Sequence, residues 1–120
     1  MIENCIFCKI SRGSSSSSNL IYENDNFFSI LDKQPWTEGH SLVISKKHFE
    51  TSLDLPNSLG SELLDCLKHT ALLITKKNKA EGFHILQNNF EAADQIVKHA
   101  HFHVIPRKKG DGKDFKQFNN

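Results

Sequence analysis

His99, His101 and His103 alternate with apolar residues near the end of the chain. In an extended strand, successive side chains point to opposite faces and each residue advances the chain by about 3.3 Å, so these imidazoles are expected on one face at intervals of roughly 6 to 7 Å. Phe102 and Val104 then face the core. A solvated strand would carry Thr, Lys or Glu at such positions, so the pattern predicts a small chemical site built from imidazole.

Cys5 and Cys8 form a Cys-x-x-Cys pair, which is compatible with zinc binding, with redox chemistry or with no function. Zinc needs two further ligands, and His48 with one of the three strand histidines would complete a set of two thiolates and two imidazoles. His99 is the candidate because it lies at the open start of the predicted strand. Four protein ligands leave no position for water, so such a zinc site would be structural.

The composition bounds the kind of protein. The 120 residues are 38% hydrophobic, enough for one globular core and too few for two comfortable ones. A net charge of +1 gives no broad electrostatic footprint for nucleic acid or anionic lipid. No apolar run approaches the roughly 18 residues of a membrane span, and the N-terminus lacks the basic region of a signal peptide. We therefore expect a cytoplasmic protein without nucleic-acid or membrane partners.

The elements that position these residues predict an α+β fold. Apolar residues recur at three and four residues from about 57 to 78, which indicates an amphipathic helix that covers one face of a sheet. Residues 4–12 suit a short N-terminal helical segment. Five segments rich in β-favouring residues predict a mainly antiparallel sheet; two of them form a hairpin at 21–32, and the others lie at 40–45, 82–88 and 99–105.

A single domain is expected over residues 1–120. The serine run at 14–18 is too polar to bury and is predicted to be a flexible surface loop. Residues 108–120 follow the last strand and are predicted to be a mobile tail. Cys66 and His69 lie on the long helix, where we expect a reduced structural thiol and a surface histidine.

The alternating histidines resemble the signature of the histidine-triad (HIT) family of nucleotide hydrolases and transferases. Further matches occur in the family's order and close to its spacing, at Cys5 to Ile10, Leu31-Asp32, Gly39 to Ile44, Asn88-Asn89 and Gln95. The resemblance covers about residues 5 to 107 and implies a HIT-like fold and a two-fold homodimer. The zinc-containing bacterial members use the positions that correspond to Cys5, Cys8, His48 and His99, which implies a structural Zn²⁺ there.

The resemblance also implies a reaction. His101 would attack the α-phosphorus of a nucleoside phosphoramidate, a dinucleoside polyphosphate or a similar conjugate, and water would then cleave the nucleotidyl-histidine. A neutral imidazole with a reference pKa of about 6.5 suits this role, because it is mostly uncharged near pH 7 and needs no second base. His103 is placed on the same face to hydrogen-bond a non-bridging oxygen.

The same likeness assigns a pocket for a purine nucleotide. Asp32 can accept both ribose hydroxyls, while Phe7, Ile10 and Leu31 would pack against the base. Three further positions belong to the implied substrate site, namely Asn88 as a donor to ribose or phosphate, Gln95, and His40 as a supporting group.

The loop before the histidines departs from the family's pattern. Phe90 and Asp94 replace two glycines and Ile96 replaces a polar residue, which costs conformational freedom where φ is positive. Asp94 would also place like charge beside a phosphate. We therefore expect a slower or choosier hydrolase. Two alternatives stay open: a zinc-stabilised nucleotide-binding module with little or no catalysis, and a metal-dependent enzyme with the three alternating histidines as ligands.

Overall fold

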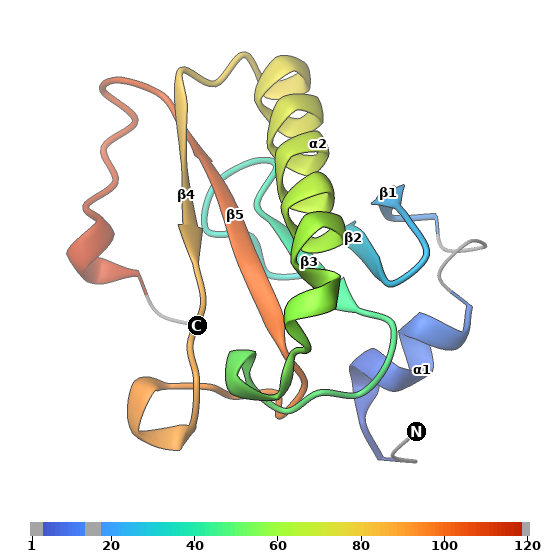
Figure 1. The fold of residues 1–120 in the computed structure, drawn as a ribbon. Helices are drawn as coiled ribbons and strands as arrows, with labels where there is room; N and C mark the ends of the chain where they lie inside the picture. Colours follow the sequence, from blue (N-terminus) through green and yellow to red (C-terminus); the bar gives the residue numbers. More distant parts are fainter. Residues whose placement is uncertain (1–3, 14–17, 119–120) are drawn as a thin grey trace.

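A computed structural model describes residues 4–13 and 18–118 (Figure 1). It contains one five-stranded sheet in the order β1-β2-β3-β5-β4, and every neighbouring pair of strands is antiparallel. The strands are β1 Leu20–Glu23, β2 Phe27–Leu31, β3 Ser41–Ser45, β4 Gly82–Leu86 and β5 His101–Arg107. The predicted fold class is confirmed. The serine loop predicted at 14–18 lies outside the described residues except for Ser18.

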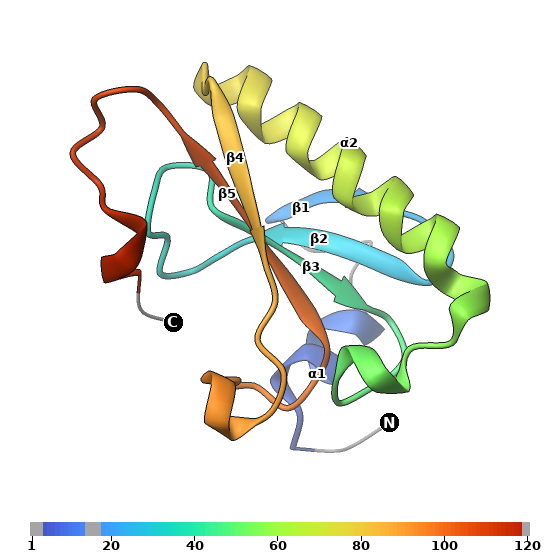
Figure 2. The ribbon, with the colours of Figure 1, turned by 60° about the vertical axis from the view of Figure 1, so that its left-hand side comes forward.

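One long helix, α2 (Gly60–Asn78), crosses one face of the sheet (Figure 2). A short 3₁₀ turn at Asn57–Leu59 precedes it, so the predicted helix at 57–78 is confirmed. Its buried side is apolar apart from Thr70, and Lys79 ends it in a left-handed conformation whose N–H donates to the carbonyls of the last turn. Neither α-helix in the described ranges combines the length and apolar character needed to cross a bilayer.

The sheet separates two apolar clusters. Phe102 and Val104 belong to the cluster under α2, as the alternation of the strand predicts. The opposite cluster contains side chains of β2 and β3 together with Phe7 from the short helix α1 (Ile6–Arg12). His101 pairs with Ile44 and His103 with Leu42 across β3 and β5, and both of these partners lie in that second cluster. The face opposite α2 therefore carries the two strand histidines.

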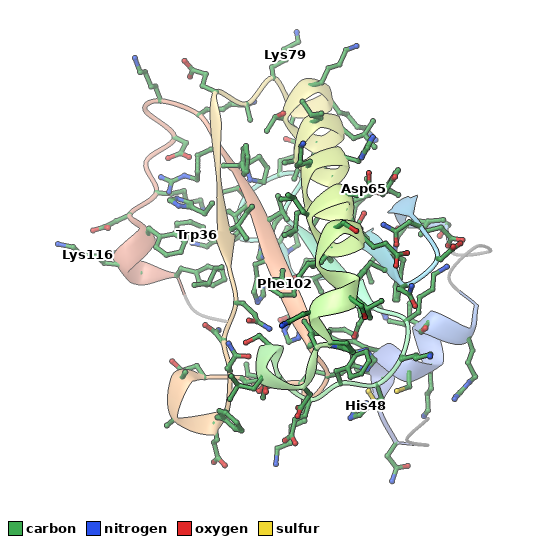
Figure 3. All side chains as sticks on the ribbon, in the orientation of Figure 1. Trp36, His48, Asp65, Lys79, Phe102 and Lys116 are labelled. Carbon is green, nitrogen blue, oxygen red and sulfur yellow. The ribbon has the colours of Figure 1, made fainter. Side chains whose placement is uncertain are left out.

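Two segments differ from the sequence-based expectation. β5 begins at His101 rather than at residue 99, because residues 97–99 form a bend before the strand. Residues 108–118 return to the sheet and end in a 3₁₀ turn at Phe115–Gln117, where Phe115 and Phe118 pack edge-on against Trp36. Figure 3 shows Trp36 close to the turn that carries Lys116. The mobility expected of this tail stays a prediction.

Candidate active site and metal centre

A cavity of about 500 Å³ opens beside the two strand histidines. Its walls come from α1, from the segment that follows β2, from β3 and β5, and from the C-terminal turn. The residues that line it include Phe7, Ile10, Leu31, Asp32, His40, His101 and His103. Both the volume and the mixture of apolar walls with a few polar groups are typical of a small-molecule site. The structure thus brings together seven of the residues singled out in the sequence.

The hydrogen bond of His101 fixes its tautomer. Its Nδ1 lies 2.7 Å from the carbonyl oxygen of His99, and a carbonyl can only accept, so Nδ1 carries the proton and donates it. The lone pair is then on Nε2, at the far side of the ring. Burial lowers the pKa of His101, so the ring is neutral near pH 7. The result is a neutral imidazole whose unprotonated nitrogen can act as a nucleophile.

A second chain of hydrogen bonds fixes the tautomers of His40 and His103. The Trp36 backbone N–H donates to His40 Nδ1 over 3.0 Å, so the His40 proton lies on Nε2. That atom is 2.9 Å from His103 Nδ1 and donates to it. His103 therefore carries its proton on Nε2, a buried atom with no hydrogen-bond partner in the described chain. A donor without a partner, in a side chain that lines the cavity, is suited to a phosphoryl oxygen.

Burial also sets the charge of these rings. It lowers the pKa of His103 to about 3 and, as the largest cause, lowers the pKa of His40, although the nearby Asp32 carboxylate acts in the opposite direction. Asp32 Oδ2 lies 3.5 Å from His40 Nε2. The ligand atoms of Asp32, His40 and His103 are close enough to hold a metal ion. However, His40 Nε2 carries a proton, so this nitrogen has no lone pair to offer a metal. We therefore assign this group to hydrogen bonding.

The turn before β3 places His40. Gly39 has a φ of +92°, and a Cβ there would collide with the side-chain amide of Asn78. A glycine is thus required both by the backbone conformation and by the close approach of α2. His40 is 2% exposed, and the supporting role predicted for it stays a prediction.

Two predicted binding residues lie outside the cavity lining. Gln95 is buried, and its amide donates to the carbonyls of Glu50 and Val97 while its oxygen accepts from the N–H of Phe90. Its polar atoms hold the loop before β5 rather than face a ligand. Asn88 follows β4 and is half-buried, but it does not line the described cavity. A role for either side chain in substrate binding stays a prediction.

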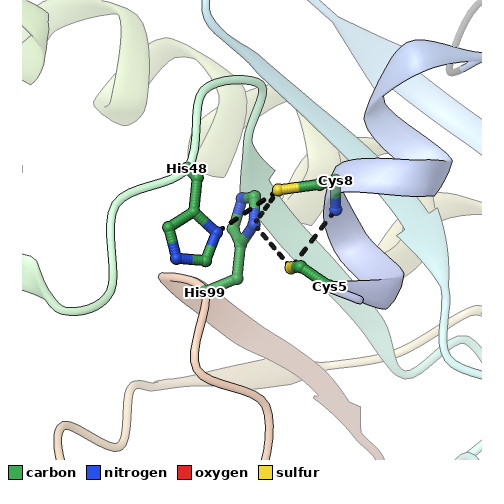
Figure 4. Close-up of side chains that lie close together, drawn as sticks. All are labelled: Cys5, Cys8, His48 and His99. Atoms are coloured by element: carbon green, nitrogen blue, oxygen red, sulfur yellow. Dashed lines mark hydrogen bonds between the residues drawn. The ribbon is translucent and has the colours of Figure 1, made fainter. Parts of the chain in front are cut away.

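The structure confirms that Cys5, Cys8, His48 and His99 come together (Figure 4). Cys5 Sγ is 3.2 Å and Cys8 Sγ 3.5 Å from His99 Nδ1, and Cys8 Sγ is 3.3 Å from His48 Nδ1. A tetrahedral zinc site with typical bond lengths has sulfur–nitrogen edges of about 3.6 Å. Burial raises the pKa of the Cys5 thiol, and coordination to a cation would offset that cost. The donor set fits a zinc ion.

His99 is oriented toward the cysteines by β3. Its Nε2 lies 2.7 Å from the carbonyl oxygen of Ser45, so Nε2 carries the proton and Nδ1 presents its lone pair to the sulfurs. His99 lies in the bend before β5 rather than in the strand, and its ring contacts the two cysteine sulfurs instead of following the alternation of the strand. The described residues close enough to hold a metal do not include the set His99, His101 and His103, so the alternative of a three-histidine metal site has no geometric support.

The loop between β4 and β5 has the strained backbone that the missing glycines imply. Phe90 has a φ of +69° and a ψ of 162°, and Asp94 a φ of +64°. Both side chains are exposed. Asp94 does not line the cavity, so the structure gives no direct contact for the predicted effect of its charge on phosphate. The predicted slower or choosier catalysis stays a prediction.

Several cavity residues were not identified from the sequence. Trp36 supplies the backbone N–H that sets the His40 tautomer, and Phe118 packs near both His40 and His103, with ring centroids 5.8 and 5.6 Å away. Ile96 lines the cavity beside them. No periodic pattern marks Trp36 or Phe118, because their contacts depend on distant segments. Ile96 departs from the family pattern in the loop before β5, but that departure does not indicate that it lines the cavity.

An antiparallel sheet crossed by one helix, with paired histidines on its free face, defines a histidine-triad fold. The HIT domain matches residues 14–110, so the chain belongs to the HIT family.

Curated relatives include the adenosine 5'-monophosphoramidase of Candida albicans, which is 41% identical over 109 residues that cover 88% of this chain and 71% of that protein. An adenylylsulfatase of Arabidopsis thaliana is 40% identical over 108 residues, which are 90% of this chain and 54% of that longer protein. These two relatives are named for cleaving nucleotide conjugates.

A solved structure of a Zn-bound histidine triad family protein from Mycobacterium smegmatis has a TM-score of 0.83 at 36% identity, and the match covers 98% of this chain and 84% of that one. A HIT family protein from Bacillus subtilis has a TM-score of 0.82 at 35% identity and covers 98% of this chain and 87% of its own. The fold of this chain is therefore shared with its solved relatives almost throughout.

Proposed function

We propose that this protein is a nucleotide hydrolase that cleaves the bond between the α-phosphate of a purine nucleotide and its leaving group through a covalent nucleotidyl-His101. The observation that supports it most directly is the hydrogen bond from His101 Nδ1 to the His99 carbonyl, which leaves a lone pair on Nε2 of a neutral ring that lines the cavity. The names of the two curated relatives point to the same class of substrate.

In the first step, His101 Nε2 forms a bond to phosphorus and the bond from phosphorus to the leaving nitrogen or oxygen breaks. The leaving group takes the electron pair of that bond and then a proton from solvent. The positive charge on the His101 ring is stabilised by the His99 carbonyl that accepts from Nδ1. In the second step, water attacks phosphorus and gives up a proton to solvent, the electron pair of the P–N bond returns to His101 Nε2, and the nucleoside monophosphate is released. One difficult displacement is thereby divided into two easier ones.

His103 and His40 act on the phosphoryl group. The Nε2–H of His103 would donate to a non-bridging oxygen, where charge develops in the transition state. His40 holds that proton on Nε2 by donating to His103 Nδ1. Replacement of His40 by a residue that cannot donate would allow the other His103 tautomer, in which a lone pair faces the phosphate.

The remaining cavity walls suit a nucleoside. Asp32 is half-buried at the end of β2, where its carboxylate can accept from ribose hydroxyls. Phe7, Ile10 and Leu31 present apolar surface to the same cavity, which is the environment a purine base requires. A nucleotide with its phosphate at His101 and its base against these side chains would use each of them.

We further propose that the cysteine and histidine cluster holds a structural Zn²⁺. Cys5, Cys8, His48 and His99 would supply all four ligands, so the ion would leave no position for substrate and would contribute stability rather than chemistry. The carbonyl that orients His101 belongs to His99, and the ion would thereby also steady the nucleophile.

We also propose a homodimer. Phe83 and Ile85 on the edge strand β4 are 47% and 50% exposed, and Leu72 on α2 is 66% exposed. An apolar edge strand with unpaired backbone groups is a surface that proteins normally cover. A second copy of the chain is the partner that the family resemblance implies.

Mass spectrometry tests the proposed reaction. After brief incubation with adenosine 5'-phosphoramidate and acid-free quenching, the peptide that contains His101 should gain the mass of one adenylyl group, and a His101→Gln protein should not. Release of AMP should depend on His101 in the same way. AMP binding without an adduct or turnover would instead support the nucleotide-binding module, and an adduct on another residue would contradict the assignment of the nucleophile.

A further inference from the structure

Helix α1 contributes to both sites. Cys5 caps its first turn and Cys8 lies within it, so the helix supplies both thiols of the metal cluster. Phe7 and Ile10 lie on the same helix and line the nucleotide cavity, and residues three apart share one side of a helix. We propose that α1 couples the metal centre to the nucleotide cavity, so that binding of the ion and binding of the nucleotide strengthen each other. This inference rests on the proposed function.

The position of α1 depends on its contacts with the sheet. It has seven residues, whereas isolated helices shorter than about 12 to 15 residues are marginal in water. Phe7 packs into the cluster under the histidines, and Ser11 Oγ donates to the Lys46 carbonyl over 2.7 Å. The cysteines approach His48 and His99 at the other end (Figure 4). An ion at that end would fasten the helix, and with it two walls of the cavity.

A second route connects the same two sites. The Phe7 ring packs edge-on against His99 and His101, with centroids 5.9 and 5.0 Å away. His99 itself presents Nδ1 to the cysteines and its carbonyl to His101. A displacement of α1 or of the His99 ring would therefore change the nucleotide cavity near the phosphate and near the base. Nucleotide that fills the cavity would in turn hold Phe7 and Ile10, and so hold the cysteines.

Thermodynamic linkage makes the coupling measurable from either side. If the ion raises nucleotide affinity by some factor, the nucleotide must raise metal affinity by the same factor. The full chain is loaded with one equivalent of Zn²⁺, and its metal affinity is measured by equilibrium competition with a chromophoric chelator, with and without saturating AMP. We expect AMP to tighten zinc on the order of tenfold, within the usual range of such couplings. Calorimetry of AMP binding with and without metal should give the same factor.

Two matched variants locate the coupling. Ile10→Ala removes a cavity wall carried by α1, and Leu31→Ala removes one carried by β2. Both should weaken AMP binding, but at saturating AMP the Leu31→Ala protein should keep the full effect on zinc affinity and the Ile10→Ala protein should lose part of it, because Phe7 still connects α1 to the cavity. If metal removal merely unfolded the chain, the two variants would respond alike. That result would overturn the inference.

The test also separates this inference from the proposed function. If AMP binds the zinc-loaded wild type and zinc affinity does not change, the coupling is refuted while the nucleotide site stands. If AMP does not bind the loaded chain, both are refuted. Far-UV circular dichroism of each loaded variant verifies that affinities are compared between folded proteins.

Discussion

Phe90 adopts a backbone conformation that glycine tolerates and bulky residues avoid, so its replacement has a calculable effect on stability. With φ at +69° and ψ at 162°, the residue lies in a region that is nearly exclusive to glycine and costs other residues about 1 to 3 kcal/mol. Its ring is 53% exposed and therefore contributes roughly half of a buried Phe, about 1 kcal/mol. The direct comparison of wild type with Phe90→Gly would mix these opposing contributions.

Phe90→Ala provides the matched control. Both variants lose the ring, and in both the backbone N–H of residue 90 can still donate to Gln95 Oε1 while its carbonyl accepts from the N–H of Ala93. The alanine keeps its Cβ and the strain, whereas glycine relieves the strain and adds about 0.4 to 1 kcal/mol of unfolded-state entropy cost. We expect the Gly variant to be about 1 kcal/mol more stable than the Ala variant.

Urea unfolding of the zinc-loaded proteins measures this difference. At equal m-values the Gly variant should have the higher midpoint, and its Tm should exceed that of the Ala variant by roughly 4 °C. Equal stability of the two, or a more stable Ala variant, would show that the loop relaxes to accommodate a Cβ and that the strain argument is wrong.

The other predictions concern the histidines, the metal and the dimer. Burial lowers the pKa of His103 to about 3, whereas an unfolded histidine titrates near 6.5, so the unfolded chain binds more protons below pH 6.5 and the free energy of unfolding falls as the pH drops. At pH 5 this one group should have lowered the free energy of unfolding by about 2 kcal/mol. In urea unfolding, the stability of His103→Gln should therefore depend less steeply on pH than that of the wild type, and equal pH dependence of the two proteins would contradict this prediction. Elemental analysis should find one zinc per wild-type chain and none in Cys8→Ser, whose Tm should be lower by roughly 10 °C, whereas Cys66→Ala, which removes a buried thiol outside the cluster, should keep the metal. Ile85→Lys on the exposed edge strand should shift the proposed dimer to a monomer in sedimentation experiments, and Ile6→Lys on α1, a side chain of similar exposure, should not; a monomeric wild type would refute the proposed interface.

Local sequence patterns were sufficient to predict a large part of the fold. The spacing of apolar residues predicted α2 to within its preceding 3₁₀ turn, since the requirement to bury one side of a helix acts within a few turns. The ends of the strands were predicted less accurately, since β5 begins two residues later than expected. The chain bends at His99 before β5 begins, and there the His99 ring bonds to the Ser45 carbonyl and contacts the Cys5 sulfur. These partners are distant in the chain, so the local sequence does not indicate the contacts.

The sequence by itself determined which strand carries the chemistry and which of its sides does so, because alternation in a strand is a local property of the backbone. It also determined the donor atoms available for a metal. The tertiary structure alone decided that His99 faces the cysteines while His101 and His103 face the cavity, and which nitrogen of each ring holds the proton. Those protons are placed by the carbonyls of His99 and Ser45 and by the Trp36 N–H. Such partners meet only when the chain has folded.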